Sequence, residues 1–244
     1  DMNNKILEKE KKYLSTLHKV IDENYEKSQM TYTDNLKQIQ NYKKYFAENF
    51  YEINKDGGEI AEINLQIESL EQNNIALTKL VNRLKKQKKS PFFGKFDFKA
   101  DNEKEPTSYY IGIGHLQNEM HDNLVYDWRA DISSLYYDDV LGRTSYTCPS
   151  GEIEGELTLK RQFKIEQGVM RYYIDSSLVI DDNILMEELS KNSSAKMHDI
   201  VSTIQKEQNT LIRSSELKNT IVQGVAGSGK TSFAMHRVSY LLYK

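Results

Sequence analysis

The stretch that decides the fold of the first third of the chain is GGEIAEINLQIESLEQNNIALTKLVNRLKKQKK, residues 57–89. Its apolar residues recur by alternating steps of three and four, which is the spacing of a helix that buries one stripe against a partner helix. The stripe consists of Ile60, Ile63, Ile67, Leu70, Asn74, Leu77, Val81 and Leu84. We therefore expect a helix roughly 45 Å long at about 1.5 Å per residue, with a coiled-coil seam along one side.

The residues upstream carry a matching stripe. Apolar residues repeat by seven in two series, and a step of four between the series keeps both in one heptad register. The series are Leu7, Leu14 and Ile21, then Tyr25, Tyr32, Ile39, Phe46 and Ile53. The first proline is Pro91, and the only glycines before it are Gly57 and Gly58. We expect residues 1–90 to form an antiparallel coiled-coil hairpin, the arm, with its tip near residues 50–59.

The second helix of the arm ends in a basic run. The run consists of Arg83, Lys85, Lys86, Lys88 and Lys89. Cations near the C-terminus of a helix are favoured by the helix dipole. The run is therefore interpreted as a solvated helix end, with a contact to nucleic acid as the alternative.

Residues 91–180 differ from the arm in composition and in the spacing of their apolar residues. Short segments such as SYYIGIGHL (108–116) and VMRYYID (169–175) are rich in aromatic and β-branched residues and often alternate. The residues Glu166 to Val169 are typical of a hairpin turn before the last segment. We expect a compact, mostly antiparallel β module with Trp128 in a strand that faces its core.

Residues 181–244 return to helix, with Asp181 or Asp182 as a plausible N-cap. A short apolar strand, TIVQG (220–224), is expected before a last helix that begins near Thr231. The whole chain is therefore predicted to be α+β: an arm (1–90), a β-rich module (91–180), and a helical linker followed by the start of an α/β domain (181–244).

Composition narrows the functional classes. The chain has 244 residues, of which 38% are hydrophobic and 28% are charged, so part of it is expected to be elongated and solvated. A net charge of -3 gives no overall attraction to nucleic acid. A single cysteine, Cys148, excludes an intramolecular disulfide. No apolar run reaches the roughly 18–20 residues that span a bilayer, so we expect a cytoplasmic protein without membrane contact.

The strongest motif is GVAGSGKT, residues 224–231, which satisfies the GxxxxGK[ST] pattern between a predicted strand and a predicted helix. Its glycines let the backbone curl around an anion, and the amides of the loop and of the helix N-terminus point at phosphate. Lys230 is expected to reach the β- and γ-phosphates, and Thr231 to offer its hydroxyl to Mg²⁺. The sequence therefore predicts a site for a nucleoside triphosphate and Mg²⁺.

A second signal lies upstream of the loop. In the segment IQKEQ (204–208), the amide of a glutamine such as Gln208 can donate to and accept from adenine at the same time. A lone glutamine on a helix is usually a surface residue, and only its position ahead of the phosphate loop makes it a candidate for binding the adenine of ATP. The predicted ATP ligands are Gln208, Gly224, Gly227, Ser228, Gly229, Lys230 and Thr231, with Thr231 also on Mg²⁺.

Parts that phosphoryl transfer requires are missing after the loop. The sequence contains no strand with a metal-binding carboxylate, no water-orienting group and no arginine finger downstream, because only 13 residues follow Thr231. We expect a piece of a longer protein that ends inside its first motor domain, with no complete catalytic set and no ATP turnover of its own. The predicted unpaired strand at 220–224 and the last helix would expose apolar surface, which favours dimerisation of the piece. The exposed residues are expected to include Phe233, Val238, Tyr240, Leu241 and Leu242.

Several of these segments resemble known helicases. VQGVAGSGKTSFAMHRVSYLLY (222–243) resembles motif I of UvrD-like superfamily 1 helicases, which have RecA-like P-loop motors, and IQKEQ (204–208) resembles their Q motif. Other segments resemble the N-terminal half of HelD (helicase IV-like) proteins. They are SPFFGKFDF (90–98), YYIGIGHL (109–116), YDWRADISSLYYDD (126–139), GEIEGELTLKRQF (151–163) and MHDIVSTIQKEQNTLIR (197–213). The family usually reads DWRAP, and Asp131 stands here in place of the proline.

The resemblance implies a function beyond the residues themselves. HelD proteins bind RNA polymerase with a coiled-coil arm that enters the secondary channel, and an ATP-driven motor releases nucleic acid and recycles the polymerase. Residues 1–90 would then be the arm, and its acidic tip, with Glu52, Asp56 and Glu59, would lie near the polymerase active centre. Nucleic acid would be bound by the full-length motor.

Two other functions stay open at this point. The parent could be a DNA helicase or repair translocase that uses the arm for protein docking or for strand separation. Residues 1–244 could also act as an interaction module without enzymatic activity. The phosphate loop does not discriminate between the first two, because both need an ATP site.

Overall fold

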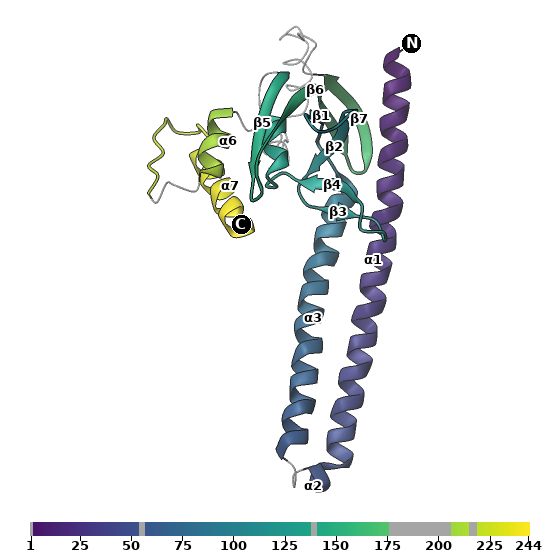
Figure 1. Ribbon diagram of the computed structural model, residues 1–244. Helices are drawn as coiled ribbons and strands as arrows, with labels where there is room; N and C mark the ends of the chain where they lie inside the picture. Colours follow the sequence, from purple (N-terminus) through teal and green to yellow (C-terminus); the bar gives the residue numbers. More distant parts are fainter. Residues whose placement is uncertain (1, 54–56, 138–140, 176–205, 215–218) are drawn as a thin grey trace.

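The computed structural model describes residues 2–53, 57–137, 141–175, 206–214 and 219–244 (Figure 1). The helix expected from Asp181 or Asp182 onward lies outside these residues up to position 205, as does Asp56 of the tip. The chain is α+β, with a long N-terminal helical region followed by a mixed β-sheet. This agrees with the fold class that the sequence predicts.

Three helices form the N-terminal region: α1 (Met2–Glu48), α2 (Phe50–Ile53) and α3 (Gly57–Lys89). The long helices α1 and α3 lie side by side and run in opposite directions, with α2 at the far end (Figure 1). Every position of the two predicted stripes is buried or half-buried. Between the two helices, buried Asn35 of α1 donates from Nδ2 to Oδ1 of Asn74 at 2.9 Å and to Oδ1 of Asn73 at 2.8 Å.

The first part of α1 packs on the sheet as well as on the last turns of α3. Leu14, Leu17 and Ile21 of α1 belong to one core cluster with strand residues such as Phe163 and Met170. In Figure 1, α1 extends past the sheet end of α3 and runs along the sheet. The segment 1–90 is therefore only partly an arm, because its first turns cover one face of the β module.

Seven strands and one short helix make up the β module. They are β1 (Gly94–Ala100), β2 (Thr107–Gly112), β3 (Leu116–Gln117), β4 (Asn123–Asp127), η1 (Ile132–Tyr137), β5 (Gly142–Cys148), β6 (Gly151–Glu166) and β7 (Val169–Asp175). The strand order is β3-β4-β2-β1-β6-β5, and β7 also pairs with β6. Among the strand pairs that the described residues form, only β2–β4 is parallel. Gln167 and Gly168 both have positive φ between β6 and β7, which confirms the predicted hairpin turn.

The two faces of the sheet pack against different helices. Side chains alternate between faces along a strand, so Tyr110 of β2 packs toward α1 while its neighbour Ile111 packs toward the other side. That other side is covered by η1, α6 (Lys206–Arg213) and α7 (Lys230–Tyr243), through Leu135, Ile212 and Phe233 among others. The sheet thus lies between the first turns of α1, which we call the root of the arm, and α7, the helix that follows the phosphate loop.

Two expectations for the C-terminal region are wrong. The segment 220–224 is not a strand, and Ile221 is 95% exposed. A strand needs a neighbour to accept its backbone hydrogen bonds, and within the described residues no strand pairs with this segment. Phe233 and Tyr240 are buried and not exposed, because α7 docks on the sheet with this side. None of the described helices has the length and apolar character that crossing a membrane requires.

Candidate nucleotide site and its connection to the arm

The phosphate-loop residues form an exposed turn that leads directly into α7. Gly227 and Gly229 have φ values of 83° and 81°, in the left-handed region that glycine adopts at little cost. At Gly224, an added Cβ would lie 2.7 Å from the hydroxyl oxygen of Ser228, so a side chain there would collide with the loop. The glycines thus meet the steric demands that the sequence motif implies.

The N-terminus of α7 is free to bind an anion. Gly229 is its N-cap, and no side chain caps the first backbone amides. Phe233 donates the first helical hydrogen bond, to the carbonyl of Gly229, which leaves the amides of the preceding turn without partners inside the helix. Such amides bind phosphate oxygens, so the loop fits a triphosphate in its donor chemistry. Thr231 is exposed in the first turn, where a hydroxyl can reach a cation beside the phosphates.

Lys230 is folded back on its own loop. Its ammonium group donates to the carbonyls of Gly224 at 2.7 Å and Val225 at 2.6 Å, and it lies 3.4 Å from the Ser228 hydroxyl. These bonds fold the loop around the ammonium group of Lys230. The ammonium has to release at least one of these three partners to bind a phosphate oxygen, because it has three donors and all of them are engaged.

The remaining predicted ligand lies on the neighbouring helix. Gln208 is exposed on α6, and α6 packs against α7. Arg237 of α7 joins the two helices by donating to the carbonyls of Leu211 at 2.6 Å and of Ile212 and Ser214 at 3.1 Å each. The structure therefore places the helix of the adenine-reading candidate beside the helix of the phosphate loop.

The half-buried Arg213 ties α6 to the sheet. The guanidinium of Arg213 donates to three successive carbonyls in the turn after β4, those of Trp128 at 2.5 Å, Arg129 at 3.3 Å and Ala130 at 3.0 Å. The guanidinium carbon of Arg213, Cζ, lies 5.3 Å from the ring centroid of Tyr240 on α7. Burial lowers the pKa of Arg213 from its ordinary value. One side chain therefore contacts the sheet, α6 and α7.

The same turn contacts α7 through the DWRAD residues. Trp128 is 4% exposed and its ring meets that of His236 edge to face, with centroids 5.7 Å apart. Arg129 is held by Asp127 through two hydrogen bonds of 2.8 and 2.6 Å, which raise the pKa of Arg129, and it reaches the Ser239 hydroxyl at 3.2 Å. Asp131 pairs with Lys244 at 2.6 Å. We call Asp127 to Asp131, with Arg213 and His236, the joint.

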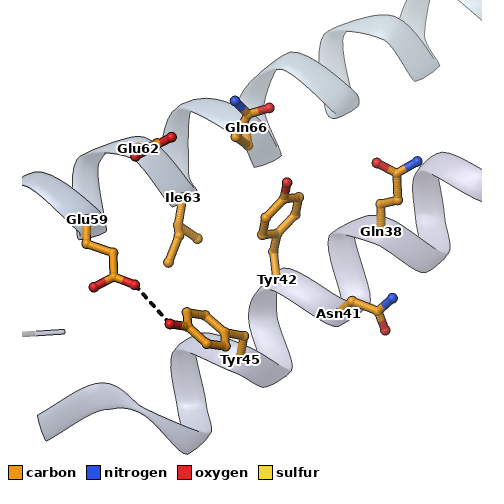
Figure 2. Close-up of a pocket in the computed structure, with 8 residues that line it drawn as sticks. All are labelled: Gln38, Asn41, Tyr42, Tyr45, Glu59, Glu62, Ile63 and Gln66. Carbon is orange, nitrogen blue, oxygen red and sulfur yellow. Dashed lines mark hydrogen bonds between the residues drawn. The ribbon is translucent and has the colours of Figure 1, made fainter. Parts of the chain in front are cut away.

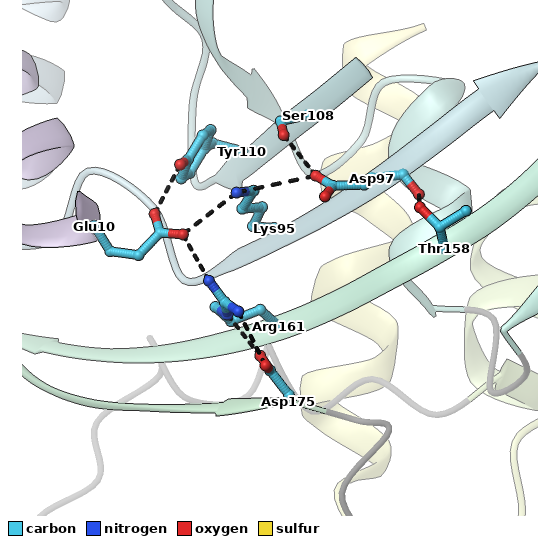
Figure 3. Close-up of polar contacts among 8 residues, drawn as sticks. All are labelled: Glu10, Lys95, Asp97, Ser108, Tyr110, Thr158, Arg161 and Asp175. Atoms are coloured by element: carbon cyan, nitrogen blue, oxygen red, sulfur yellow. Dashed lines mark hydrogen bonds and ion pairs between the residues drawn. The ribbon is translucent and has the colours of Figure 1, made fainter. Parts of the chain in front are cut away.

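The opposite face of the sheet holds the root of the arm through a buried ionic cluster (Figure 3). The carboxylate of Glu10 on α1 is 0% exposed and accepts hydrogen bonds from Tyr110 at 2.7 Å, Arg161 at 2.8 Å and Lys95 at 3.3 Å. Arg161 also binds both carboxylate oxygens of Asp175, at 2.5 and 2.9 Å. Burial, followed by the charge of Glu10, raises the pKa of Tyr110 far above its ordinary value. Three strands thus bind one carboxylate of α1.

A family model described as DNA helicase IV HelD, N-terminal domain, matches residues 7–194, which is most of the chain. The chain belongs to the HelD family. Membership indicates a helicase-type enzyme in the full-length protein and a function connected with DNA. No curated protein matches this HelD chain in a direct sequence comparison.

The sequence of this HelD chain identified only part of what its structure brings together. Trp128 is buried as expected, although it lies in the turn after β4 and not in a strand. Glu10, Arg213 and His236 were not identified from the sequence. Glu10 sits between Leu7 and Leu14 on the apolar stripe, and a charge at such a position signals a buried partner. The structure holds no cluster of three metal-ligating side chains within its described residues.

Proposed function

We propose that the chain is the N-terminal part of an ATP-dependent, UvrD-like superfamily 1 motor of the HelD type, which binds core RNA polymerase through α1 and α3 and promotes its release from nucleic acid. Two observations support the proposal. The paired helices project well beyond the sheet (Figure 1), and the phosphate-loop helix docks on the sheet face opposite the root of the arm. A cytoplasmic location accords with this function.

The loop geometry supports the proposed nucleotide site. The loop amides and the first turn of α7 would hold the β-phosphate, Lys230 the β- and γ-phosphates, and Gln208 the adenine. Thr231 would bind the Mg²⁺ ion. Mg²⁺-ATP would supply the phosphoryl-transfer chemistry, for which later parts of the motor provide the remaining groups. When the Lys230 ammonium gives up the carbonyls of Gly224 and Val225 and binds phosphate, the loop at the start of α7 would change shape.

The joint provides a path from this site to the sheet. A displacement at the start of α7 reaches His236 and Ser239 within about two to three turns, because a helix turn contains about 3.6 residues. Both residues contact the turn after β4. The sheet is then continuous through β4, β2 and β1 to β6, where Arg161 binds Glu10 of the arm. The proposed coupling therefore runs through packed side chains and through the sheet.

The arm is proposed to be a coiled coil that probes a channel of its partner. Its buried Asn35–Asn74 contact resembles the polar seam positions that fix register in coiled coils. Glu52 and Glu59 lie at the end remote from the sheet, and acidic residues there would approach the cation site of the polymerase. Nothing in this placement depends on ATP, so binding and turnover should be separable.

Retention of core RNA polymerase on immobilised chain 1–244 tests the proposal. We expect the wild-type chain and Lys230→Ala to retain polymerase equally, because Lys230 lies in the loop and not in the arm. In the full-length parent, Lys230→Ala should abolish ATP hydrolysis while leaving polymerase binding intact. Absence of polymerase retention by the wild-type chain would refute the proposed partner, and loss of both properties in Lys230→Ala would refute their separation.

A DNA helicase or repair translocase is the second candidate, and the description of the matching family as DNA helicase IV favours it. In that case the arm would dock another protein or separate strands. The full-length parent should then unwind forked DNA at a rate that polymerase does not change. Polymerase-dependent release of nucleic acid without unwinding would instead support the first candidate.

A further inference from the structure

A groove of about 580 Å³ opens between α1 and α3 close to the end of the arm (Figure 2). Tyr42 and Tyr45 of α1 form one side, and Glu59 and Glu62 of α3 form the other. The side chain of Ile63, which is buried, lies between them. The groove therefore combines aromatic rings, carboxylates and an apolar base over a length of one to two helix turns.

The polar groups of the groove are only partly engaged. Tyr45 donates from its hydroxyl to Glu59 Oε1 at 2.9 Å, which leaves the second oxygen of Glu59 available. Glu62 is exposed, and no ion pair joins Glu59 or Glu62 to a cation in the described part of the chain. The rings of Tyr42 and Tyr45 both point from α1 toward α3 (Figure 2).

Elsewhere along the described part of the paired helices, two ion pairs join α1 to α3. Lys43 of α1 pairs with Glu71 of α3 at 4.0 Å, and Lys88 of α3 pairs with Asp22 of α1 at 2.5 Å. In the groove, Glu59 and Glu62 line a space beside two tyrosine rings, and within the described residues no such cation pairs with either carboxylate. Its chemistry thus calls for a positive group from outside the described residues.

We propose that this groove binds the guanidinium group of an arginine side chain presented by a partner protein. A guanidinium is planar, so it stacks on a tyrosine ring while its N–H groups donate to a carboxylate at the ring edge. An ammonium group makes the ion pair but not the stacking, and a neutral side chain makes neither strongly. The inference deepens the proposed docking role of the arm, but binding by the groove does not require polymerase.

The test uses chain 1–244 with ¹³C-labelled tyrosine rings, read by NMR. The signals of Tyr42 and Tyr45 are assigned from Tyr42→Phe and Tyr45→Phe. The probes are the blocked tripeptides Gly-Arg-Gly, Gly-Lys-Gly and Gly-citrulline-Gly, of which the last matches arginine in shape without its charge. We expect saturable shifts of both tyrosine signals with the arginine peptide by about 20 mM, weaker binding of the lysine peptide, and none of the citrulline peptide.

Matched variants locate the effect. Glu59→Gln and Glu62→Gln together should weaken binding of the arginine peptide by at least about tenfold. Glu68→Gln, an exposed residue of the same helix outside the groove, should leave binding unchanged. The proposal is overturned if the citrulline peptide binds as well as the arginine peptide, if Glu68→Gln weakens binding equally, or if the arginine peptide shifts neither tyrosine.

The polymerase experiment separates this proposal from the proposed function. If the arginine peptide binds as expected and the chain does not retain polymerase, the groove stands and its partner is another protein. If polymerase is retained equally by the wild-type chain and by the Glu59→Gln, Glu62→Gln variant, the proposed function stands and the groove is overturned as a determinant of docking.

Discussion

Glu10 illustrates how a single buried charge can fix the attachment of an entire helix. Its carboxylate is surrounded by Tyr110, Lys95 and Arg161, each from a different strand. A buried ionic group of this kind contributes little net stability compared with an apolar core, but removing one partner leaves the others uncompensated. Its effect is therefore expected to be on the position and orientation of α1 as much as on the free energy of unfolding.

Replacing Glu10 with alanine should lower the free energy of unfolding by about 3 kcal/mol, because Lys95 and Arg161 then lose a buried counter-charge. Urea denaturation followed by circular dichroism measures this change. Glu23→Ala provides the control, since Glu23 is exposed on the same helix and should change stability by less than about 0.5 kcal/mol. Equal effects of the two substitutions would contradict the assigned role of Glu10.

Tyr45 gives a residue-scale prediction that depends on pH. Its hydrogen bond to Glu59, followed by the charge of Glu59, raises the pKa of the Tyr45 phenol above its ordinary value. The bond is therefore fully present below the ordinary pKa and is lost as the pH rises through the raised pKa. Glu59→Gln should bring the pKa of Tyr45 back toward the ordinary value in an NMR titration, whereas Glu68→Gln should leave it unchanged. An unchanged pKa in Glu59→Gln would show that the bond does not persist in solution.

The elements differ in how far the sequence determined them. The helices α1 and α3 follow from local periodicity, since a stripe with steps of three and four is a property of neighbouring residues. The hairpin between β6 and β7 also follows from a few adjacent residues, among them Gly168. The segment 220–224 has strand composition without a strand neighbour in the described residues, so the prediction failed where pairing is decided by distant parts of the chain.

The candidate site shows the same division between local and distant information. The loop glycines and Lys230 could be predicted because the motif is contiguous and its conformations are local. The joint could not, because Arg213 acts on carbonyls of the turn at 128–130, and carbonyl acceptors leave no trace in a sequence. Phe233 and Tyr240 were predicted to be exposed because their helix was considered without the sheet on which it docks.

The contact between Asn35 and Asn74 is expected to set the alignment of α1 against α3 at some cost in stability. Replacing both with leucine should raise the free energy of unfolding by about 1 kcal/mol and allow alternative alignments. Spin labels at the exposed positions Lys37 and Gln72, in a Cys148→Ser background, should report a broader distance distribution. Gln40→Leu, at an exposed site of α1, should change neither quantity. A narrower distribution together with lower stability would contradict the alignment role.

At the scale of the whole molecule, α7 has one apolar face on the sheet and another that is exposed. Met235, Val238, Leu241 and Leu242 are between 50% and 83% exposed, although Phe233 and Tyr240 are buried. We expect chain 1–244 to associate as its concentration rises, and Val238→Lys with Leu242→Lys to reduce this association. Light scattering measures it. Leu65→Lys, which removes an exposed leucine from α3, is the control, and equal reduction by this control would contradict the assigned surface.

The unbroken course of α1, from its anchored end on the sheet to the far end of the helical pair, makes it a lever. Between Glu10 and Glu48 a straight helix rises about 57 Å at about 1.5 Å per residue. A tilt of roughly 5° at the fulcrum would therefore sweep the remote end through about 5 Å, which is close to the length of one helical turn. A small tilt of the sheet beneath Glu10 would thus be enlarged at the remote end into a displacement comparable with the size of a side chain.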